Sequence, residues 1–226
     1  MKKNFRIKTI SLLVLGIINL SSCKTDEPTF KNTVTDIDGN IYHTVEIGTQ
    51  TWMVENLKTT KYNDGTAIPS ISDSIEWTTI TSPGYCWYKN DSILLKKNYG
   101  ALYNWYAVNT GKLAPKGWHI PTNSEWETLF AYLGGEKVAG GKLKETGTKN
   151  WLTPNTKATN QTGFTALPSG SRYYGKFNNE GYLCICWCAD DYFEGAYNWA
   201  IRNNTTEVTL AFSDKKSGLS VRCIKD

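Results

Sequence analysis

The chain has 226 residues, of which 40% are hydrophobic and 20% are charged, and this balance excludes an intrinsically disordered protein. Basic residues number 25 against 21 acidic ones, but residues 1–22 hold basic side chains only. The rest of the chain is therefore nearly neutral and lacks the clustered positive charge that a nucleic-acid-binding protein needs.

The first residues have the layout of a secretory signal peptide. A basic start that includes Lys2 and Arg6 precedes an apolar run from Ile10 to Leu20, and small residues then lead to Cys23. This run is shorter than the roughly 20 apolar residues that span a bilayer. The ending resembles a bacterial lipobox, which implies that residues 1–22 are removed and that acylated Cys23 anchors the protein in the lipid bilayer.

Residues 23–33 are polar and have no apolar period, so we expect a flexible tether after the lipidated Cys23. The tether contains Asp26 and Glu27. An acidic pair at this place resembles lipoproteins that Bacteroidetes-type bacteria export to the cell surface, although a solvated linker explains the charges equally well. We expect an outer-membrane lipoprotein on the cell surface, with the periplasmic face as the alternative.

Two hairpins are predicted where the mature domain begins. Residues 34–42 surround Asp38-Gly39, a dipeptide that favours a tight turn. Residues 45–54 are extended around Gly48-Thr49 in the same way. From 58 to 83 the chain is rich in Thr, Ser, Asp, Asn and Pro, which predicts a long surface loop of the kind that often carries function.

Two helices are predicted in the middle of the chain. Apolar residues share one face over 99–108. The second helix has Thr122 as N-cap and Glu125 as its capping-box partner, and Gly134-Gly135 ends it. Its apolar face is formed by Trp126, Leu129, Phe130 and Leu133.

Short extended runs are predicted after Gly140, and they complete a single domain over residues 34–226. They are residues 163–167, 183–187, 197–202, 207–212 and 219–224.

Several segments occur in an order that is typical of one family, namely residues 38–40, 50–57, 62–66, 99–105, 117–122, 140–144 and 220–223. Together they resemble the Fibrobacter succinogenes major paralogous domain, and this resemblance covers residues 34–226. It implies an α+β fold: a single C-type-lectin-like domain, as in formylglycine-generating enzymes, with short antiparallel strands, two central helices and long loops.

Five of the 6 cysteines follow Cys23, and an odd number in an exported protein leaves at least one thiol without an internal partner. The family often has cysteines that match Cys86 and Cys223, so the resemblance implies a disulfide between these two. The residues alone leave the pairing open.

Cys184, Cys186 and Cys188 alternate along a predicted strand and should face the same side. Three thiolates can hold a soft metal. Alternatively, the cysteines pack as small apolar residues or form disulfides. Structural zinc needs four ligands and the chain has only 2 histidines, so we favour buried or disulfide-linked cysteines and expect neither metal nor cofactor.

Signatures of enzymes are largely missing. His43 and His119 have no nucleophile motif beside them, so a structural or exposed position is favoured for both. The related formylglycine-generating enzymes use a redox-active cysteine pair near the C-terminus, and only Cys223 resembles one of the two. We therefore do not expect formylglycine formation.

Aromatic residues are abundant, with 9 Trp and 13 Tyr, and such side chains suit sugar rings and protein hot spots. We assign Trp52, Trp105, Trp118 and Trp126 to the core because each lies in a predicted element or a family motif. Asp190, Asp191 and Glu194 fit an acidic cation site or a solvated loop equally well. The candidate binding residues are the aromatic residues in predicted loops, namely Trp77, Trp87, Trp151, Tyr173 and Tyr174.

These patterns favour a membrane-anchored, non-catalytic binding or adhesion module for a glycan or a protein. The alternative is an enzyme distantly related to formylglycine-generating proteins, or a thiol-redox protein, which an exposed thiol of low pKa within 184–188 would favour. A purely structural envelope protein is a third possibility.

Overall fold

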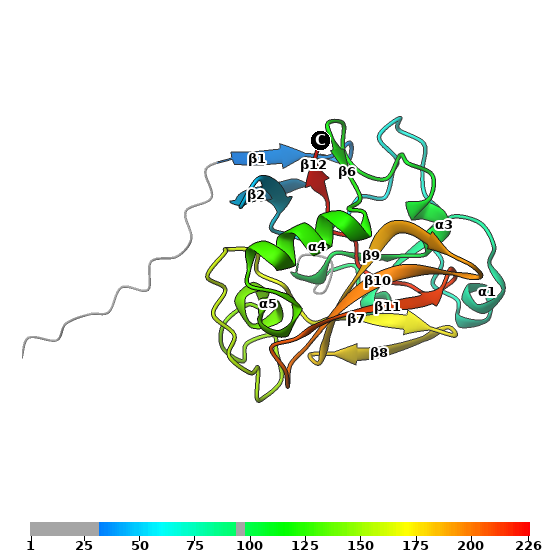
Figure 1. The fold of residues 1–226 in the computed structure, drawn as a ribbon. Helices are drawn as coiled ribbons and strands as arrows, with labels where there is room; N and C mark the ends of the chain where they lie inside the picture. The colour runs from blue at the N-terminus through cyan, green and yellow to red at the C-terminus, as the bar shows by residue number, and fades with distance from the viewer. Residues whose placement is uncertain (1–31, 94–97) are drawn as a thin grey trace, which may run out of the picture.

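The computed structural model describes residues 32–93 and 98–226. They form a mixed α+β domain with four antiparallel sheets and a few short helices (Figure 1). The expected signal peptide, Cys23 and most of the tether lie outside the described residues. Within these residues, none of the helices is both long and apolar enough to cross a membrane.

The largest sheet joins the two ends of the domain, with strand order β1-β2-β3-β12-β6. Both predicted hairpins are confirmed: Val34 pairs with Tyr42 and Val45 pairs with Trp52. The predicted strand over 219–224 is reduced to its end, where Ile224 pairs with Trp52. The strands are β1 (Asn32–Thr35), β2 (Ile41–Ile47), β3 (Gln50–Met53), β6 (Trp118–His119) and β12 (Ile224–Lys225).

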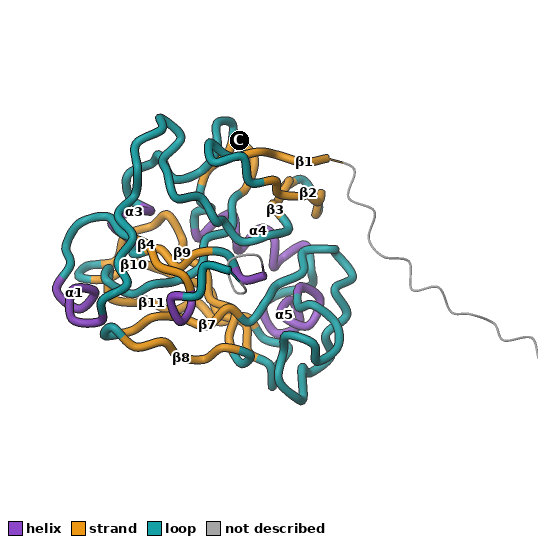
Figure 2. Tube along the Cα trace, turned by 180° about the vertical axis from the view of Figure 1, so that it is seen from behind, coloured by secondary structure: helices purple, strands orange, loops and turns teal. Residues whose placement is uncertain are grey.

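The other three sheets lie side by side in the part of the domain away from β1 (Figures 1 and 2). Three predicted strands are confirmed as a meander in the order β11-β10-β9, whereas residues 163–167 form no strand. The remaining sheets are two hairpins, β4–β5 and β7–β8. The bounds are β4 (Tyr85–Trp87), β5 (Ala101–Tyr103), β7 (Ser169–Tyr173), β8 (Lys176–Glu180), β9 (Leu183–Tyr192), β10 (Gly195–Arg202) and β11 (Val208–Asp214).

The capped helix is confirmed in detail. Thr122 accepts a hydrogen bond from the amide of Glu125, and the Glu125 carboxylate accepts one from the amide of Thr122 at 2.8 Å. Each partner thereby satisfies a donor that the first helical turn leaves unpaired. The helices are α1 (Ser74–Thr79), α3 (Trp105–Val108), α4 (Asn123–Tyr132) and α5 (Glu136–Leu143), with a 3₁₀ turn η1 (Tyr88–Asn90).

The prediction of one helix over 99–108 is wrong. Ala101–Tyr103 is strand β5, which pairs with β4, and only the last part forms α3. Asn104 separates the two, because its side chain accepts a hydrogen bond from the amide of Ala107 and caps α3. Strand pairing with a distant segment therefore overrides the local helical period.

Helix α5 was not predicted, because Gly140 and Gly141 make it a poor helix former by intrinsic propensity. A Cβ atom at Gly140 would lie 2.8 Å from the carbonyl oxygen of Glu207, and one at Gly141 would lie 2.8 Å from that of Lys157. The glycines thus allow two backbone segments to pack directly on the helix, and this close packing offsets their low helical propensity.

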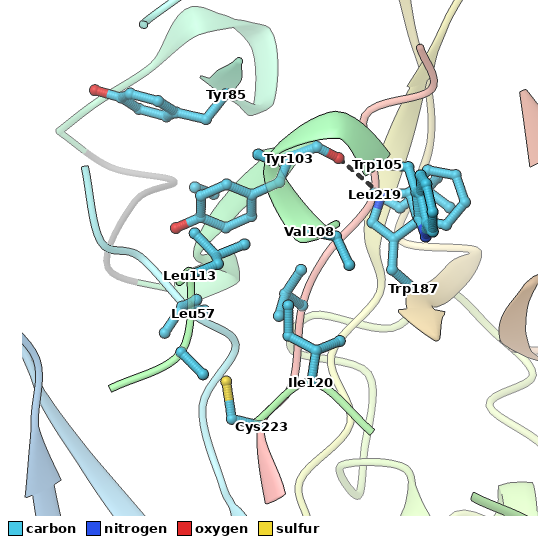
Figure 3. Packing of buried hydrophobic residues seen from close by; sticks show 14 of the residues in the cluster. Leu57, Tyr85, Tyr103, Trp105, Val108, Leu113, Ile120, Trp187, Leu219 and Cys223 are labelled. Carbon is cyan, nitrogen blue, oxygen red and sulfur yellow. Dashed lines mark hydrogen bonds between the residues drawn. The ribbon is translucent and has the colours of Figure 1, made fainter. Parts of the chain in front are cut away.

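The core consists of two large clusters on opposite faces of β9 and a smaller third cluster around Trp77. Ile185 and Trp187 point into one cluster, whereas the three cysteines of β9 point into the other. Figure 3 shows Trp187 beside Trp105 and Leu219 in the first cluster. The Trp187 indole donates a 2.8 Å hydrogen bond to the carbonyl of Tyr103, so the polar edge of this buried ring is satisfied.

Candidate ligand-binding site

A small pocket opens where α1, the β7–β8 hairpin and the end of β11 meet, and its volume is ≈ 70 Å³. It brings together three of the predicted residues, namely Trp77, Tyr173 and Tyr174. The predicted loop over 58–83 is thus interrupted by α1, which contributes Trp77. The complete lining is Trp77, Thr78, Tyr173, Tyr174, Asp214, Lys216 and Ser217.

Trp77 lies against the pocket with only 1% of its surface exposed. Its indole Nε1–H finds no hydrogen-bond acceptor within the described part of the chain. Buried polar groups in folded proteins are nearly always paired, so an unpaired one calls for an explanation. The nitrogen atom is itself enclosed by the protein, so this donor is not open to the pocket.

Arg172 holds the aromatic wall in place from behind. Its buried guanidinium donates to the carbonyls of Ile71, Ser72 and Asp73 at 2.7–3.0 Å. It also stacks on the Trp77 ring, and its Nε donates to the carbonyl of Gly175. One side chain therefore joins the segment before α1 to the β7–β8 hairpin, which uses the planar donor geometry that only arginine has.

Tyr174 forms the exposed side of the pocket from an unusual backbone conformation. It has φ 47° and the following Gly175 has φ 74°, as in the two-residue turns that join twisted strands. The left-handed region costs a non-glycine residue roughly 1–2 kcal/mol. Tyr174 nevertheless occupies it with 82% of its surface exposed.

Gly175 brings the turn into direct contact with α1. A Cβ atom at this position would lie 2.3 Å from the carbonyl oxygen of Ser74. The missing side chain therefore permits the close approach that forms the pocket.

The opposite wall is polar. The Asp214 carboxylate accepts a 2.8 Å hydrogen bond from the amide of Lys216, and the amide of Ser217 donates to the carbonyl of Asp214. These contacts fix the Asp214 carboxylate and the turn that carries Lys216 and Ser217. The pocket thus combines aromatic faces with donors and acceptors, as small-molecule sites do.

A second group of aromatic residues, which the sequence analysis missed, lies at the same end of the domain. The ring of Tyr192 lies 5.1 Å from Phe193, 4.9 Å from Tyr197 and 5.0 Å from Phe212. Phe193 is 88% exposed and, like Tyr174, has a positive φ, here 41°. The available signal was the aromatic pair Tyr192-Phe193, which lies two residues before Gly195 and between two predicted strands.

Comparison with protein-family models matches residues 45–225 to the Fibrobacter succinogenes major domain. The chain belongs to this family. None of the curated proteins and none of the solved structures matches it.

Trp87 and Trp151 of this Fibrobacter succinogenes major domain are not surface residues, contrary to the prediction. Trp87 is 8% exposed and Trp151 is 0% exposed. Trp151 donates from its indole to the carbonyl of Ala166 at 2.9 Å. Trp87 lies in strand β4, which the sequence analysis did not predict, and the irregular segment around Trp151 is packed against the core, so a position outside the predicted elements does not imply exposure. Trp77 is likewise buried, but it lines the pocket.

The expected disulfide between Cys86 and Cys223 is absent, and the five described cysteines are free and buried. Cys86 lies in a cluster with Trp77 and Leu102, whereas Cys223 belongs to the cluster around Trp187. The two thiols lie on opposite faces of the β4–β5 hairpin. Burial raises the pKa of Cys86 to about 12.

The cysteines of β9 share one face, as predicted, and each is at most 3% exposed. A hydrogen bond with Cys186 lowers the pKa of Cys184 and raises that of Cys186, and burial raises the pKa of Cys188. An exposed thiol of low pKa, which would favour a redox protein, is not found among the described residues.

The histidines and acidic residues considered from the sequence are bound to other groups. His119 lies between Asp226 and Glu125, 2.8 Å from each carboxylate, and His43 lies 2.6 Å from Glu55. The acidic residues of the β9–β10 region do not converge: Asp190 accepts a hydrogen bond from the amide of Asn123, and Asp191 pairs with Lys215. Over residues 32–93 and 98–226, no set of three such side chains is placed to hold a metal ion.

Proposed function

We propose that this protein is a non-catalytic binding module for a glycan, which inserts one projecting group into the pocket of Trp77 and Tyr174. The observation that carries the proposal is the pocket itself, in which Tyr173 and exposed Tyr174 lie with the polar residues Asp214 and Ser217 over the buried ring of Trp77. Carbohydrate hydroxyl groups both donate and accept hydrogen bonds, so they can pair with a carboxylate and a hydroxyl.

The composition of the pocket supports a sugar over a purely apolar ligand. Tyr173 and Tyr174 offer aromatic faces to the C–H side of a sugar ring, and Asp214 and Ser217 offer hydrogen-bonding groups to its hydroxyls. A volume of ≈ 70 Å³ holds only a few water molecules. It therefore suits one projecting group of a longer chain that continues over exposed Tyr174.

Backbone strain points to the same end of the domain. Tyr174 and Phe193 are bulky aromatic residues at hairpin turns with positive φ, and both are exposed. Glycine or asparagine would occupy such positions at lower cost. Strained residues gather at functional sites, and exposed aromatic groups mark binding surfaces.

The anchoring scheme fits a displayed binding site. In this proposal Cys23 is acylated and holds the protein in the outer membrane, with the domain facing the cell exterior. Strand β1, where the described chain begins, lies at the opposite side of the domain from α1 (Figures 1 and 2). A tether that leaves from β1 would thus direct the pocket away from the bilayer. Detergent phase partitioning of the protein and of Cys23→Ser, with protease treatment of intact cells, tests the anchor and its orientation.

We also propose that the scaffold is a variant of the C-type-lectin-like fold. The support is the joining of both ends of the domain in one sheet by β1, β2 and β12, together with the short strands and long irregular segments. The alternative of a thiol-redox or formylglycine-forming enzyme finds less support, because the described cysteines are buried.

Binding of the full-length protein in mild detergent to a glycan array tests the sugar proposal. Asp214→Asn keeps an acceptor for the amide of Lys216 but removes the charge of the polar wall, and Tyr174→Ala removes the exposed aromatic face. We expect specific binding that both variants weaken at least tenfold. Tyr132→Ala, at another exposed tyrosine on α4, is the control and should bind normally. An array without signal from folded protein would refute a glycan ligand and turn the search to proteins.

A further inference from the structure

The outer edge of β11 is an open sheet edge. Strand β11 pairs with β10 on one side only. Helix α5 packs near its start, where the amide of Gly141 donates to the carbonyl of Thr206. From Val208 to Ser213, the described chain provides no further backbone partner. An unpaired edge of this kind is a template for another strand.

The open edge lacks the usual features that prevent pairing. Residues 208–213 contain neither proline nor a charged side chain, although folded proteins commonly protect an edge in these ways. Leu210 and Phe212 are instead exposed on one face, at 37% and 64%. Isolated exposed apolar residues are ordinary, but an apolar row along an open edge is a site for association.

The sequence of this edge is complementary to itself. When two antiparallel copies meet with Ala211 opposite Ala211, Leu210 of one copy faces Phe212 of the other, and Thr209 faces Ser213. The same register brings Val208 level with Asp214 at both ends, outside these central pairs. Lys215 follows the strand and takes no part, because its ammonium group is held by Asp191 and the Trp105 ring.

We propose that this protein forms a two-fold symmetric dimer by antiparallel pairing of β11 with β11 of a second copy. The two three-stranded sheets become one continuous sheet, and Leu210 and Phe212 of both copies form a shared apolar strip. The two-fold axis passes between the two Ala211 residues. Each copy uses the same edge, so the assembly is complete with two chains. This inference does not depend on the identity of the ligand.

Disulfide trapping across the axis tests the dimer. Directly opposed residues of antiparallel strands have Cα atoms about 4.5 or 5.5 Å apart, which lies within disulfide range. Full-length Ala211→Cys in mild detergent, oxidised with copper phenanthroline, should migrate mainly as a dimer on a non-reducing gel. Asn178→Cys on the exposed hairpin strand β8 is the matched control. On the same gel it should migrate as a single chain, like the wild type, because no disulfide links the two copies.

A second change identifies the contact. Adding Phe212→Lys to Ala211→Cys should reduce the cross-linked fraction to the wild-type level. Light scattering of the wild type, corrected for detergent, should give two chains per particle. A monomeric wild type, or cross-linking of Ala211→Cys no greater than that of Asn178→Cys, would overturn the proposal. A thermal melt of each variant confirms that it is folded.

Discussion

The guanidinium of Arg172 lies 4.5 Å from the centre of the Trp77 ring. The same group, only 1% exposed, donates to carbonyls of the segment that leads into α1. A residue of the pocket wall is thus placed by a residue buried behind it. Because a buried cation is stable only when its donors are satisfied, this arrangement makes the pocket wall rigid.

Replacement of Arg172 should therefore destabilise the domain. Arg172→Lys keeps the charge but loses the planar fork, which leaves buried carbonyls unpaired, and we expect a loss of about 2–4 kcal/mol in the free energy of unfolding. Chemical denaturation measures it. Arg202→Lys, at an exposed arginine that bonds Thr209, should change stability by less than about 0.5 kcal/mol. Equal effects at both positions would contradict the role given to Arg172.

Tyr174 should separate binding from stability. Tyr174→Asn places a residue that tolerates positive φ at this turn, so the free energy of unfolding should stay equal or rise by up to about 1 kcal/mol, while glycan binding falls. Tyr182→Asn makes the same exchange at an exposed tyrosine without positive φ and should bring no gain. A clear loss of stability in Tyr174→Asn would show that the tyrosine is retained for packing.

The close approach of Gly175 to α1 can be isolated with a matched pair of substitutions. Both Gly175 and Gly65 have positive φ, but only Gly175 has a neighbour in the way of a Cβ atom, since nothing lies within 4 Å at Gly65. Gly65→Ala should cost about 1 kcal/mol from backbone strain alone. Gly175→Ala should cost at least about 1 kcal/mol more, measured by denaturation. Similar costs would mean that the hairpin can move away from α1 freely.

His119 should make stability depend on pH. Burial opposes its protonation, but hydrogen bonds to Asp226 and Glu125 outweigh burial, so the pKa of His119 is raised. Unfolded histidine releases its proton near pH 6.5, whereas the folded protein retains it to higher pH. The stabilisation is therefore complete below about pH 6.5 and is lost as pH rises through the folded pKa.

The measurement is the difference in unfolding free energy between the wild type and His119→Gln. It should be largest near pH 6 and shrink toward pH 9. Burial opposes ionisation of Glu125, but hydrogen bonds from Thr122 and His119 outweigh it, so the pKa of Glu125 is lowered. The difference in unfolding free energy should therefore also decline in strong acid, where Glu125 is protonated. A difference that stays constant between pH 5.5 and 9 would show that the ion pair does not contribute.

The described thiols should be inert in the folded protein. All five are buried, and thiols in apolar surroundings do not ionise readily. Alkylation with iodoacetamide, followed by mass spectrometry of each site, should modify them only after denaturation. Rapid modification of Cys184 or Cys186 under native conditions would instead revive the redox alternative.

Local patterns in the chain were enough to predict those elements that local contacts stabilise. The Asp38-Gly39 hairpin and the helix that begins at Thr122 depend on turn chemistry and capping within a few residues. The alternation of Cys184, Cys186 and Cys188 on one face follows from strand geometry alone. Motif order identified the family, which the match over 45–225 confirms.

Tertiary structure alone decided which aromatic residues are accessible and where the site lies. Trp151 is buried because distant segments cover it, and β5 is a strand because β4 pairs with it. The pocket of Trp77, Tyr174 and Asp214 joins three segments that are far apart in the chain. The burial of a side chain and the meeting of residues at one site both depend on contacts between segments that are far apart in the chain. A local sequence pattern does not show which distant segment packs on a given residue.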